Sequence, residues 1–483
     1  MKRISRISSR VRGIILITVF LLIVSLNTLP LTAALGEETK VPILTLEEAL
    51  QITAEKNRDI QKALEYRKQV EAIYITERSA ALPQIFITAY AVNSRDESQK
   101  ALGTPAFVIP LQFSGVEVPL RFPAFQGPVR TNARSAEIQV SQSLFTWGQI
   151  GAAIRAAKVG METAEDQLRI FRQAAFRDVS ASFYDILLTE ELHAITSQNL
   201  EQKNRHYDEA QKKYAAGVAT DYDVLSAKVD FENAQPAVIQ TENLIRISKE
   251  RLRFLLGTDA NEVGVKGTME PQISPYPDYQ EAEEIAYKNR PELSGLRHRK
   301  QIAEEFIKIA QSGDKPRLDF KGGFGWRDLY VSVDQQANGK AWSAGLFVTY
   351  PIFDGLRTRG QVAQAKSNLA SLKIDEAKLL DAIRLEVRDA VNGVRESGEI
   401  IKALSGTVAR AERLLTMAEK GYEYGVNTKL VVDDAELNVV QAKGNLARAK
   451  RDYLVACVNL ERATGTLGEK EPRCGTSAPR MNP

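Results

Sequence analysis

Histidine and cysteine, the side chains that most often bind metals or act as nucleophiles, are scarce in this chain. Its 483 residues include three histidines and two cysteines. His193, His206 and His298 are never three or four residues apart, the spacing that places a pair on one helix face. Cys457 and Cys474 are too few for a four-cysteine zinc site or a disulfide framework, and Cys457 is expected to be a small buried helix residue. The sequence therefore predicts no bound metal and no cofactor.

Motifs for nucleotide binding and hydrolysis are also missing from the sequence. It contains no GxxxxGK[ST] loop of the kind that cradles phosphates, no nucleophile elbow and no histidine placed to act as a base. The glycine-rich run at 322–325 is interpreted as part of a strand. The chain is therefore not expected to be an enzyme.

The charge distribution and the N-terminal segment indicate an exported protein. Lysine and arginine number 64 and aspartate and glutamate 61, but five basic residues fall within the first twelve positions, so the remainder is nearly neutral. A nucleic-acid-binding protein is expected to carry a basic surplus. An apolar run at 14–26 and small residues at 32–34 follow the basic segment, as in a secretory signal peptide. We expect residues 1–34 to be cleaved; an uncleaved anchor is the alternative.

The sequence repeats itself once. Residues 49–60 (ALQITAEKNRDI) resemble 282–293 (AEEIAYKNRPEL), and 214–220 (YAAGVAT) resemble 422–428 (YEYGVNT). Each repeat is predicted to contain a helix, two strands and then two long helices. The expected organisation is a first repeat at 35–258, a linker at 259–280, a second repeat at 281–467 and a disordered tail at 468–483.

Long helices dominate both repeats. Residues 161–216 contain neither glycine nor proline, and as one helix they would extend roughly 84 Å at about 1.5 Å per residue. Apolar residues such as Leu379, Ile383 and Val387 recur at four-residue steps, which is typical of packed helices. Pro236 predicts a kink in the returning helix of the first repeat. The predicted helical hairpins span 148–256 and 357–465.

Four shorter segments alternate between apolar and polar residues, as half-buried strands do. In one of them Leu318, Phe320, Phe324 and Trp326 have one parity and Asp319 has the other. Strands of about ten residues with this period are typical of transmembrane barrels, although a soluble sheet packed on the helices is the alternative. Four strands cannot close a barrel by themselves, whereas lipid requires closure; three chains of four strands each would give twelve. The predicted strands are 84–93, 135–146, 317–333 and 340–353.

The order of these motifs resembles the TolC-like outer-membrane efflux protein family over nearly the whole mature chain. Residues 212–235 (KKYAAGVATDYDVLSAKVDFENAQ) and 419–443 (EKGYEYGVNTKLVVDDAELNVVQAK) are similar to the family's two periplasmic turns. Phe145 to Gly148 and Phe353 to Gly355 are similar to its strand-to-helix junctions. The resemblance implies an α+β membrane protein, a homotrimer whose 12-stranded β-barrel, with four strands per chain, is continued by a 12-helix periplasmic α-barrel of long coiled-coil hairpins.

The same resemblance implies an export channel in the outer membrane of a Gram-negative-type bacterium, with most of the chain in the periplasm. Its implied partners are outer-membrane lipid, a periplasmic adaptor (membrane fusion protein) and an inner-membrane pump of the RND, ABC or MFS type, but no nucleic acid. It would be the exit duct of a tripartite efflux or type I secretion system. The alternatives are a soluble periplasmic coiled-coil scaffold or adaptor, and a diffusion porin.

The two predicted turns share a glycine and a threonine. Gly217 and Gly425 follow long helices that a left-handed residue can end, and Thr220 and Thr428 are N-cap candidates for the next helices. The resemblance implies that these turns contact the adaptor, whereas a helical turn without a partner is the alternative. The expected contact residues are Gly217, Val218, Ala219, Thr220, Gly425, Val426, Asn427 and Thr428.

Members of the family close the inner end of the tunnel with carboxylates, and Asp434 matches one of these positions. Val431 stands at the companion position, where the family has an acid. Asp433 is acidic but lies about 100° round the helix from Asp434, so it lines the pore in part or faces a neighbour. A ring of three Asp434 side chains would attract cations; capping of the helix by an acidic pair is the alternative.

The resemblance also implies a lock between hairpins in the closed state. Tyr422 and Asp223 match one contact of this lock, a phenol that donates to a carboxylate. The second contact uses an arginine in the family, but Asn427 stands there in this sequence. A neutral hydrogen bond from Asn427 or a charge from Lys429 would replace it.

Overall fold

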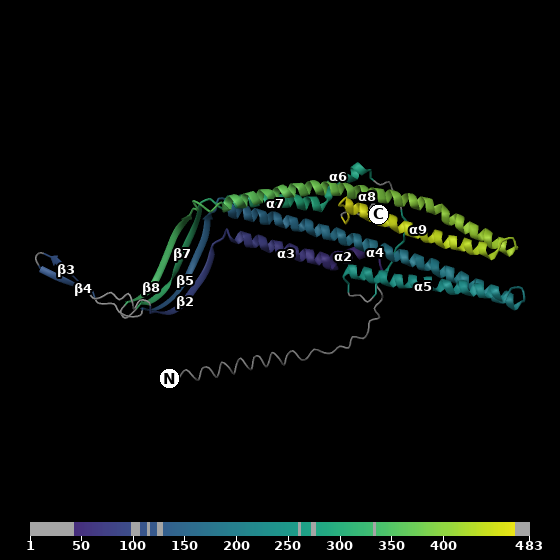
Figure 1. Cartoon of the computed structure of the whole chain (residues 1–483), viewed down its shortest axis with the longest axis horizontal. Helices are drawn as coiled ribbons and strands as arrows, with labels where there is room; N and C mark the ends of the chain where they lie inside the picture. Colours follow the sequence, from purple (N-terminus) through teal and green to yellow (C-terminus); the bar gives the residue numbers. More distant parts are fainter. Residues whose placement is uncertain are drawn as a thin grey trace, which may run out of the picture.

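The computed structural model describes residues 43–97, 107–113, 116–122, 129–258, 262–271, 277–331 and 335–468. The predicted signal peptide, Cys474 and residues 469–483 of the predicted tail lie outside these described residues. The described chain is elongated, with a four-stranded sheet near one end and long helices that run from the sheet to two turns at the far end (Figure 1).

Both halves of the chain follow the same order of elements, except for two additional strands in the first half. The first half contains β1 (Ile43–Leu44), α2 (Leu46–Lys56), α3 (Arg58–Ser79), β2 (Gln84–Asp96), β3 (Phe107–Phe113), β4 (Val116–Phe122), β5 (Val129–Phe145), α4 (Gln149–Ala215) and α5 (Asp221–Leu256). The second half contains β6 (Gly264–Val265), α6 (Tyr279–Asn289), α7 (Pro291–Gln311), β7 (Arg317–Val331), β8 (Gln335–Thr349), α8 (Arg357–Glu423) and α9 (Lys429–Ala463).

Each half opens with two helices where we expected one. In the first half Asn57 ends α2 and caps α3, because its Oδ1 accepts hydrogen bonds from the backbone N–H groups of Asp59 (2.9 Å) and Ile60 (3.1 Å). In the second half Arg290 is extended, as expected for a residue before a proline, and Pro291 begins α7. Both breaks fall inside the repeated sequence, so the repeat marks a junction between two helices.

Four strands form one antiparallel sheet in the order β2-β5-β7-β8. The two halves therefore meet at its centre, where β5 pairs with β7. Within the described part of the chain, β2 and β8 each keep one edge without a partner strand. The strands are longer than a short soluble hairpin needs, from 13 residues in β2 to 17 in β5.

The sheet has one apolar and one polar face. Ile87, Ile138, Phe324 and Trp342 are register partners, so they form one row across all four strands. These four side chains are 47–78% exposed, and such a patch on a protein surface indicates contact with lipid or protein. The opposite face carries the polar residues of the alternating pattern. One of its rows is Gln84, Ser141, Lys321 and Gly345.

A second, two-stranded hairpin, β3–β4, occupies the insert between β2 and β5 and was not predicted. Its register runs from Phe107↔Phe122 to Phe113↔Val116. Proline stands opposite proline in it, at Pro110 and Pro119, and proline inside an alternating segment argues against a strand because it lacks an N–H donor. The hairpin lies beyond the ends of the long strands in Figure 1.

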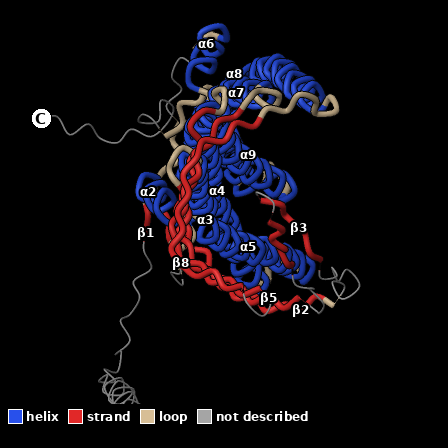
Figure 2. Tube along the Cα trace, turned by 90° about the vertical axis from the view of Figure 1, so that its left-hand side faces the viewer, coloured by secondary structure: helices blue, strands red, loops and turns tan. Residues whose placement is uncertain are grey.

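Helix α4 is the centre of the helical layer. Near the sheet it packs between α3 and α7, and toward the turns it packs between α5 and α9, while α8 packs against α7 and α9. The order across the layer is therefore α3-α4-α7-α8 near the sheet and α5-α4-α9-α8 near the turns. Sheet and helices curve toward the same side, with α2 and α6 on the convex side (Figure 2).

The apolar core lies midway along the helices. Phe183 and Ile186 of α4 pack there with Leu252 of α5 and Leu454 of α9. Cys457 is buried in the neighbouring cluster formed by α6, α7, α8 and α9, as expected for a small helix residue. Pro236 lies inside α5, which continues on both sides of it. Among the described helices, none is both long enough and apolar enough to cross a bilayer.

Candidate functional site

Both helical hairpins turn at a glycine, as predicted. Gly217 and Gly425 have φ angles of 76° and 75°, a left-handed conformation that side chains with a Cβ rarely adopt. Thr220 then caps α5 in a reciprocal arrangement: its Oγ1 accepts from the Asp223 N–H (3.3 Å), and the Asp223 carboxylate accepts from the Thr220 N–H (2.8 Å). Thr428 is the N-cap of α9 without a side-chain hydrogen bond.

A buried glutamate on α9 joins the second hairpin to the first. Glu436 is 2% exposed. The Nζ of Lys203, on α4, donates to Glu436 Oε2 (2.5 Å) and to Asp433 Oδ1 (2.9 Å). His206 Nε2 lies 2.7 Å from Glu436 Oε1, and Gln202 Nε2 donates to the same oxygen (2.6 Å). Of these three residues of α4, His206 is nearest to the first turn, about 16 Å before Gly217 at a rise of about 1.5 Å per residue.

A lysine near the start of α9 extends these contacts to α5. The Nζ of Lys429 donates to Asp230 Oδ2 (2.9 Å) and to Asp433 Oδ2 (3.2 Å). Together with the contacts of Glu436, this connects α9 to both helices of the first hairpin. We name this set the inter-hairpin cluster; it consists of Gln202, Lys203, His206, Asp230, Lys429, Asp433 and Glu436.

Charge complementarity keeps the buried members of the cluster ionised. Burial alone would raise the pKa of Glu436, but hydrogen bonds with His206 and Lys203 outweigh it and lower that pKa. Burial alone would lower the pKa of Lys203, but its bonds to Glu436 and Asp433 outweigh burial and raise it. Each charge therefore depends on its partner, and loss of one partner leaves the other buried without compensation.

The two candidate constriction residues differ in their surroundings. Asp433 is engaged by two lysines, Lys203 and Lys429, so its charge is neutralised inside the chain. The Asp434 side chain is exposed, and the described residues supply no hydrogen bond or ion pair to its carboxylate. Leu430 and Leu437, at four- and three-residue spacing, are exposed on the same face of α9. Asp434 is therefore the better candidate for a carboxylate that faces a pore.

Tyr422 and Asp223, the first pair of the predicted lock, are not joined within one chain. The Asp223 carboxylate is occupied by the N–H and hydroxyl of Thr220, and no hydrogen bond to Tyr422 is found among the described residues. Tyr422 instead reaches the first hairpin through Lys213, whose Nζ lies 5.7 Å from the centre of the ring. The pairing of Tyr422 with Asp223 stays a prediction for the assembled protein.

Of the two residues expected at the second contact of the predicted lock, Lys429 and not Asn427 contacts the first hairpin within the described chain. The Nδ2 of Asn427 donates to the Ala418 carbonyl, 3.4 Å away in its own hairpin. Lys429 bridges α9 to α5 through Asp230 (2.9 Å). Of the two replacements considered for the family's arginine, the structure gives only Lys429 a contact between hairpins.

Sequence reasoning missed Lys203, His206, Asp230 and Glu436. One signal was available, because Glu436 follows Val432 at a four-residue step and so occupies a buried stripe of α9. A glutamate in such a stripe needs a cationic partner. The partners themselves lie more than 200 residues away in the sequence, and local patterns do not identify them.

The lowered pKa of Glu436 predicts that acid weakens the cluster. The folded carboxylate has a pKa below its ordinary value of 4.5, so its contribution to stability is complete above about pH 4.5 and is lost as the pH falls through the folded pKa. We expect Glu436→Gln to lower the free energy of unfolding by about 3 kcal/mol at pH 7. The difference between wild type and variant should shrink below about pH 4.5.

The measurement is the thermal unfolding midpoint, followed by far-ultraviolet circular dichroism from pH 3.5 to pH 7. Glu412→Gln is the matched control, because Glu412 pairs with Lys443 inside one hairpin and is half exposed. If the unfolding midpoints of Glu436→Gln and wild type differed by the same amount at every pH, or did not differ, the assignment would be wrong.

A sheet with one exposed apolar face, two long helical hairpins and a concave side together define an elongated channel protomer. Comparisons with known proteins agree. The profile of the family described as "Outer membrane efflux protein" matches residues 49–258 and 284–466. The chain belongs to this family, and it is an outer-membrane exit duct.

Two relatives and one solved structure are similar to this chain. The outer membrane protein TolC of Vibrio cholerae serotype O1 is 24% identical over 404 residues, which cover 82% of this chain and 85% of TolC. The alkaline protease secretion protein AprF of Pseudomonas aeruginosa is 24% identical over 323 residues, which cover 64% of this chain and 65% of AprF. The solved outer-membrane channel OprN superposes with a TM-score of 0.71 at 19% identity, covering 87% of this chain and 90% of OprN.

Proposed function

We propose that three copies of this chain assemble into a continuous duct, through which an inner-membrane pump and a periplasmic adaptor export their substrate. The main support is that the sheet and both regions of the helical layer have their edges on the same two sides of the protomer. β2, α3 and α5, from the first half, end the layers on one side, and β8 and α8, from the second half, end them on the other. Head-to-tail contacts between unlike edges close into a ring.

The free face of α5 supports such a contact. Ala227 and Leu252 are buried on the side of α5 that packs on α4. Val229, Ile247 and Phe254 lie at roughly 180° from them at about 3.6 residues per turn, and they are 45%, 56% and 76% exposed. An apolar stripe that faces away from α4, the long helix on which α5 packs, requires another helix to cover it.

The two faces of the sheet support closure of the strands in a membrane. Three copies supply twelve strands and leave no free edge, which lipid requires. The apolar row with Phe324 and Trp342 would then face lipid, and the row with Ser141 and Lys321 would face the lumen. The polar face would form the wall of the exit.

The two turns support contact with a periplasmic adaptor. Val218 and Val426 are 75% and 81% exposed at the ends of the hairpins, next to the left-handed Gly217 and Gly425. Small and apolar residues at a protruding end offer little steric resistance to a partner's side chains. The pump would supply the energy, since this sequence has no phosphate-binding loop.

We expect Ile247→Glu to prevent trimer formation and to release the chain from the membrane, because each of three contacts would bury an unpaired carboxylate. Native mass spectrometry of detergent extracts and carbonate washing of membranes measure the two effects. Val426→Glu is the control, an exposed valine on a turn, and should leave the trimer intact. Wild-type protein that leaves the membrane in carbonate would favour the soluble scaffold instead.

A further inference from the structure

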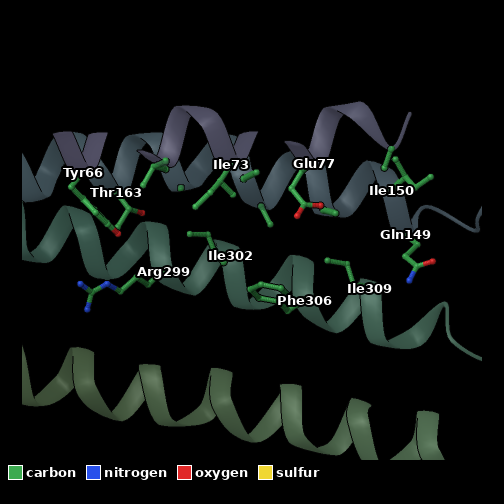
Figure 3. A pocket seen from close by; sticks show the side chains of 16 residues that line it. Tyr66, Ile73, Glu77, Gln149, Ile150, Thr163, Arg299, Ile302, Phe306 and Ile309 are labelled. Atoms are coloured by element: carbon green, nitrogen blue, oxygen red, sulfur yellow. The ribbon is translucent and has the colours of Figure 1, made fainter. Parts of the chain in front are cut away.

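A groove of about 680 Å³ lies beside the sheet, between α3 and α7. Small residues of α4 form its floor, among them Ala153, Ala157 and Gly160. Larger side chains form its walls, with Ile73 on α3 and Phe306 on α7 (Figure 3). The groove exists because α4 has alanine and glycine on its floor, whereas the neighbouring helices carry branched and aromatic side chains there.

This groove opens on the side of the layer that we assign to the lumen. Ala80, Gln149 and Ile150 line it, and they also line a smaller cavity of about 230 Å³ together with Ser141 and Ser143. The two serines belong to the polar face of the sheet. Groove and polar face are therefore continuous.

One carboxylate on the wall of the groove has no cationic partner. Glu77 is half-buried on α3 and extends toward the groove near Phe306 (Figure 3). The described residues place no hydrogen-bond donor and no cation on its carboxylate. Arg299 lies at the other end of the groove, with its guanidinium extending away from the centre (Figure 3).

The opposite face of α4 differs in this respect. There Glu165 pairs with Arg67, and Asp166 with His298. These two carboxylates therefore have partners within the chain, whereas the carboxylate of Glu77 is available to a ligand in the groove. A carboxylate on an apolar, aromatic wall favours a ligand that combines a positive charge with an apolar body.

We propose that the groove binds amphiphilic organic cations as they pass along the duct. The apolar body would rest on the floor of α4 between Ile73 and Phe306, and the charged centre would lie beside Glu77. The volume of the groove is within the range of about 300–1,000 Å³ that is usual for sites of drug-sized ligands. This inference rests on the proposed duct, because the groove must face the lumen to meet its ligand.

The test compares two probes of nearly equal shape and opposite charge, tetraphenylphosphonium and tetraphenylborate. Binding to the full-length trimer in lipid nanodiscs is measured by equilibrium dialysis, with empty nanodiscs subtracted. We expect the wild type to bind the phosphonium about tenfold more tightly than the borate. Glu77→Gln should abolish this preference, while Glu71→Gln, at an exposed carboxylate of α3 outside the groove, should preserve it.

A second variant tests the location independently of charge. Ala153→Phe fills the floor of the groove and should weaken binding of both probes about tenfold. Equal affinity for both probes in the wild type, or affinities unchanged in Glu77→Gln and Ala153→Phe, would overturn the inference. Single-channel conductance separates this failure from failure of the duct, since a conducting trimer without selective binding refutes the groove alone. A chain that forms no conducting trimer refutes both.

Discussion

Lys429→Ala is expected to raise the single-channel conductance of the assembled protein several-fold. Lys429 connects α9 to Asp230 on α5 and also engages Asp433, so its ammonium group holds the second hairpin against the first near the periplasmic end. Without it Asp230 and Asp433 lose a common cation, and two carboxylates that shared it repel each other. The hairpins should separate, which widens the narrow end of the duct. Recording in planar lipid bilayers measures the change.

Two further variants decide whether the bridge itself is responsible. Asp230→Asn removes the other partner and should give a similar conductance, and the double variant should add little because both changes break one interaction. Lys443→Ala is the matched control: Lys443 pairs with Glu412 at 2.9 Å, but both residues belong to the second hairpin. An equal increase in Lys443→Ala would show that general loosening of the helices, and not the bridge between hairpins, sets the conductance.

The pair implied by family resemblance provides a comparison. Tyr422→Phe combined with Asp223→Ala should raise the conductance if assembly brings these two residues together. The second change also removes the reciprocal cap with Thr220, which costs about 1 kcal/mol of helix stability. Tyr422→Phe alone avoids this effect. If conductance were unchanged in the single and the double variant, contacts of the inter-hairpin cluster alone would hold the channel closed.

Asp434→Asn is expected to reduce the preference of the channel for cations over anions severalfold. Its carboxylate is exposed and lacks a partner within the described chain, and it lies between Leu430 and Leu437 on one face of α9. Three copies would place three negative charges around a narrow opening between apolar rims, where low dielectric strengthens their field. The reversal potential in a salt gradient measures the permeability ratio.

Asp433→Asn is the informative comparison for this selectivity. Asp433 differs from Asp434 by one position, but two lysines neutralise it. We therefore expect Asp433→Asn to change the permeability ratio little and to act on conductance instead, through the inter-hairpin cluster. Loss of cation preference in Asp433→Asn with no loss in Asp434→Asn would reverse the two roles.

Much of the fold could be predicted because the required information is local. The long glycine-free segment of α4 predicts a helix through its own composition, and the glycine at each turn is required by a left-handed backbone at that residue. Strand alternation in β7 and β8 reflects a sheet with two unlike faces. Where apolar residues occur at both parities, as at Ile85 and Phe86 in β2, alternation leaves the orientation open and only the register with β5 resolves it.

The sequence by itself determined the class of protein, the duplication, the long hairpins, the turns and the candidate Asp434. The tertiary structure alone decided which charges meet. Lys203 and His206 are about 230 positions from Glu436, and their pairing depends on α4 and α9 lying side by side. The groove beside Glu77 also required it, because residues of α3, α4 and α7 form it together. Both features depend on contacts between distant segments, and a one-dimensional pattern carries no information about such distances.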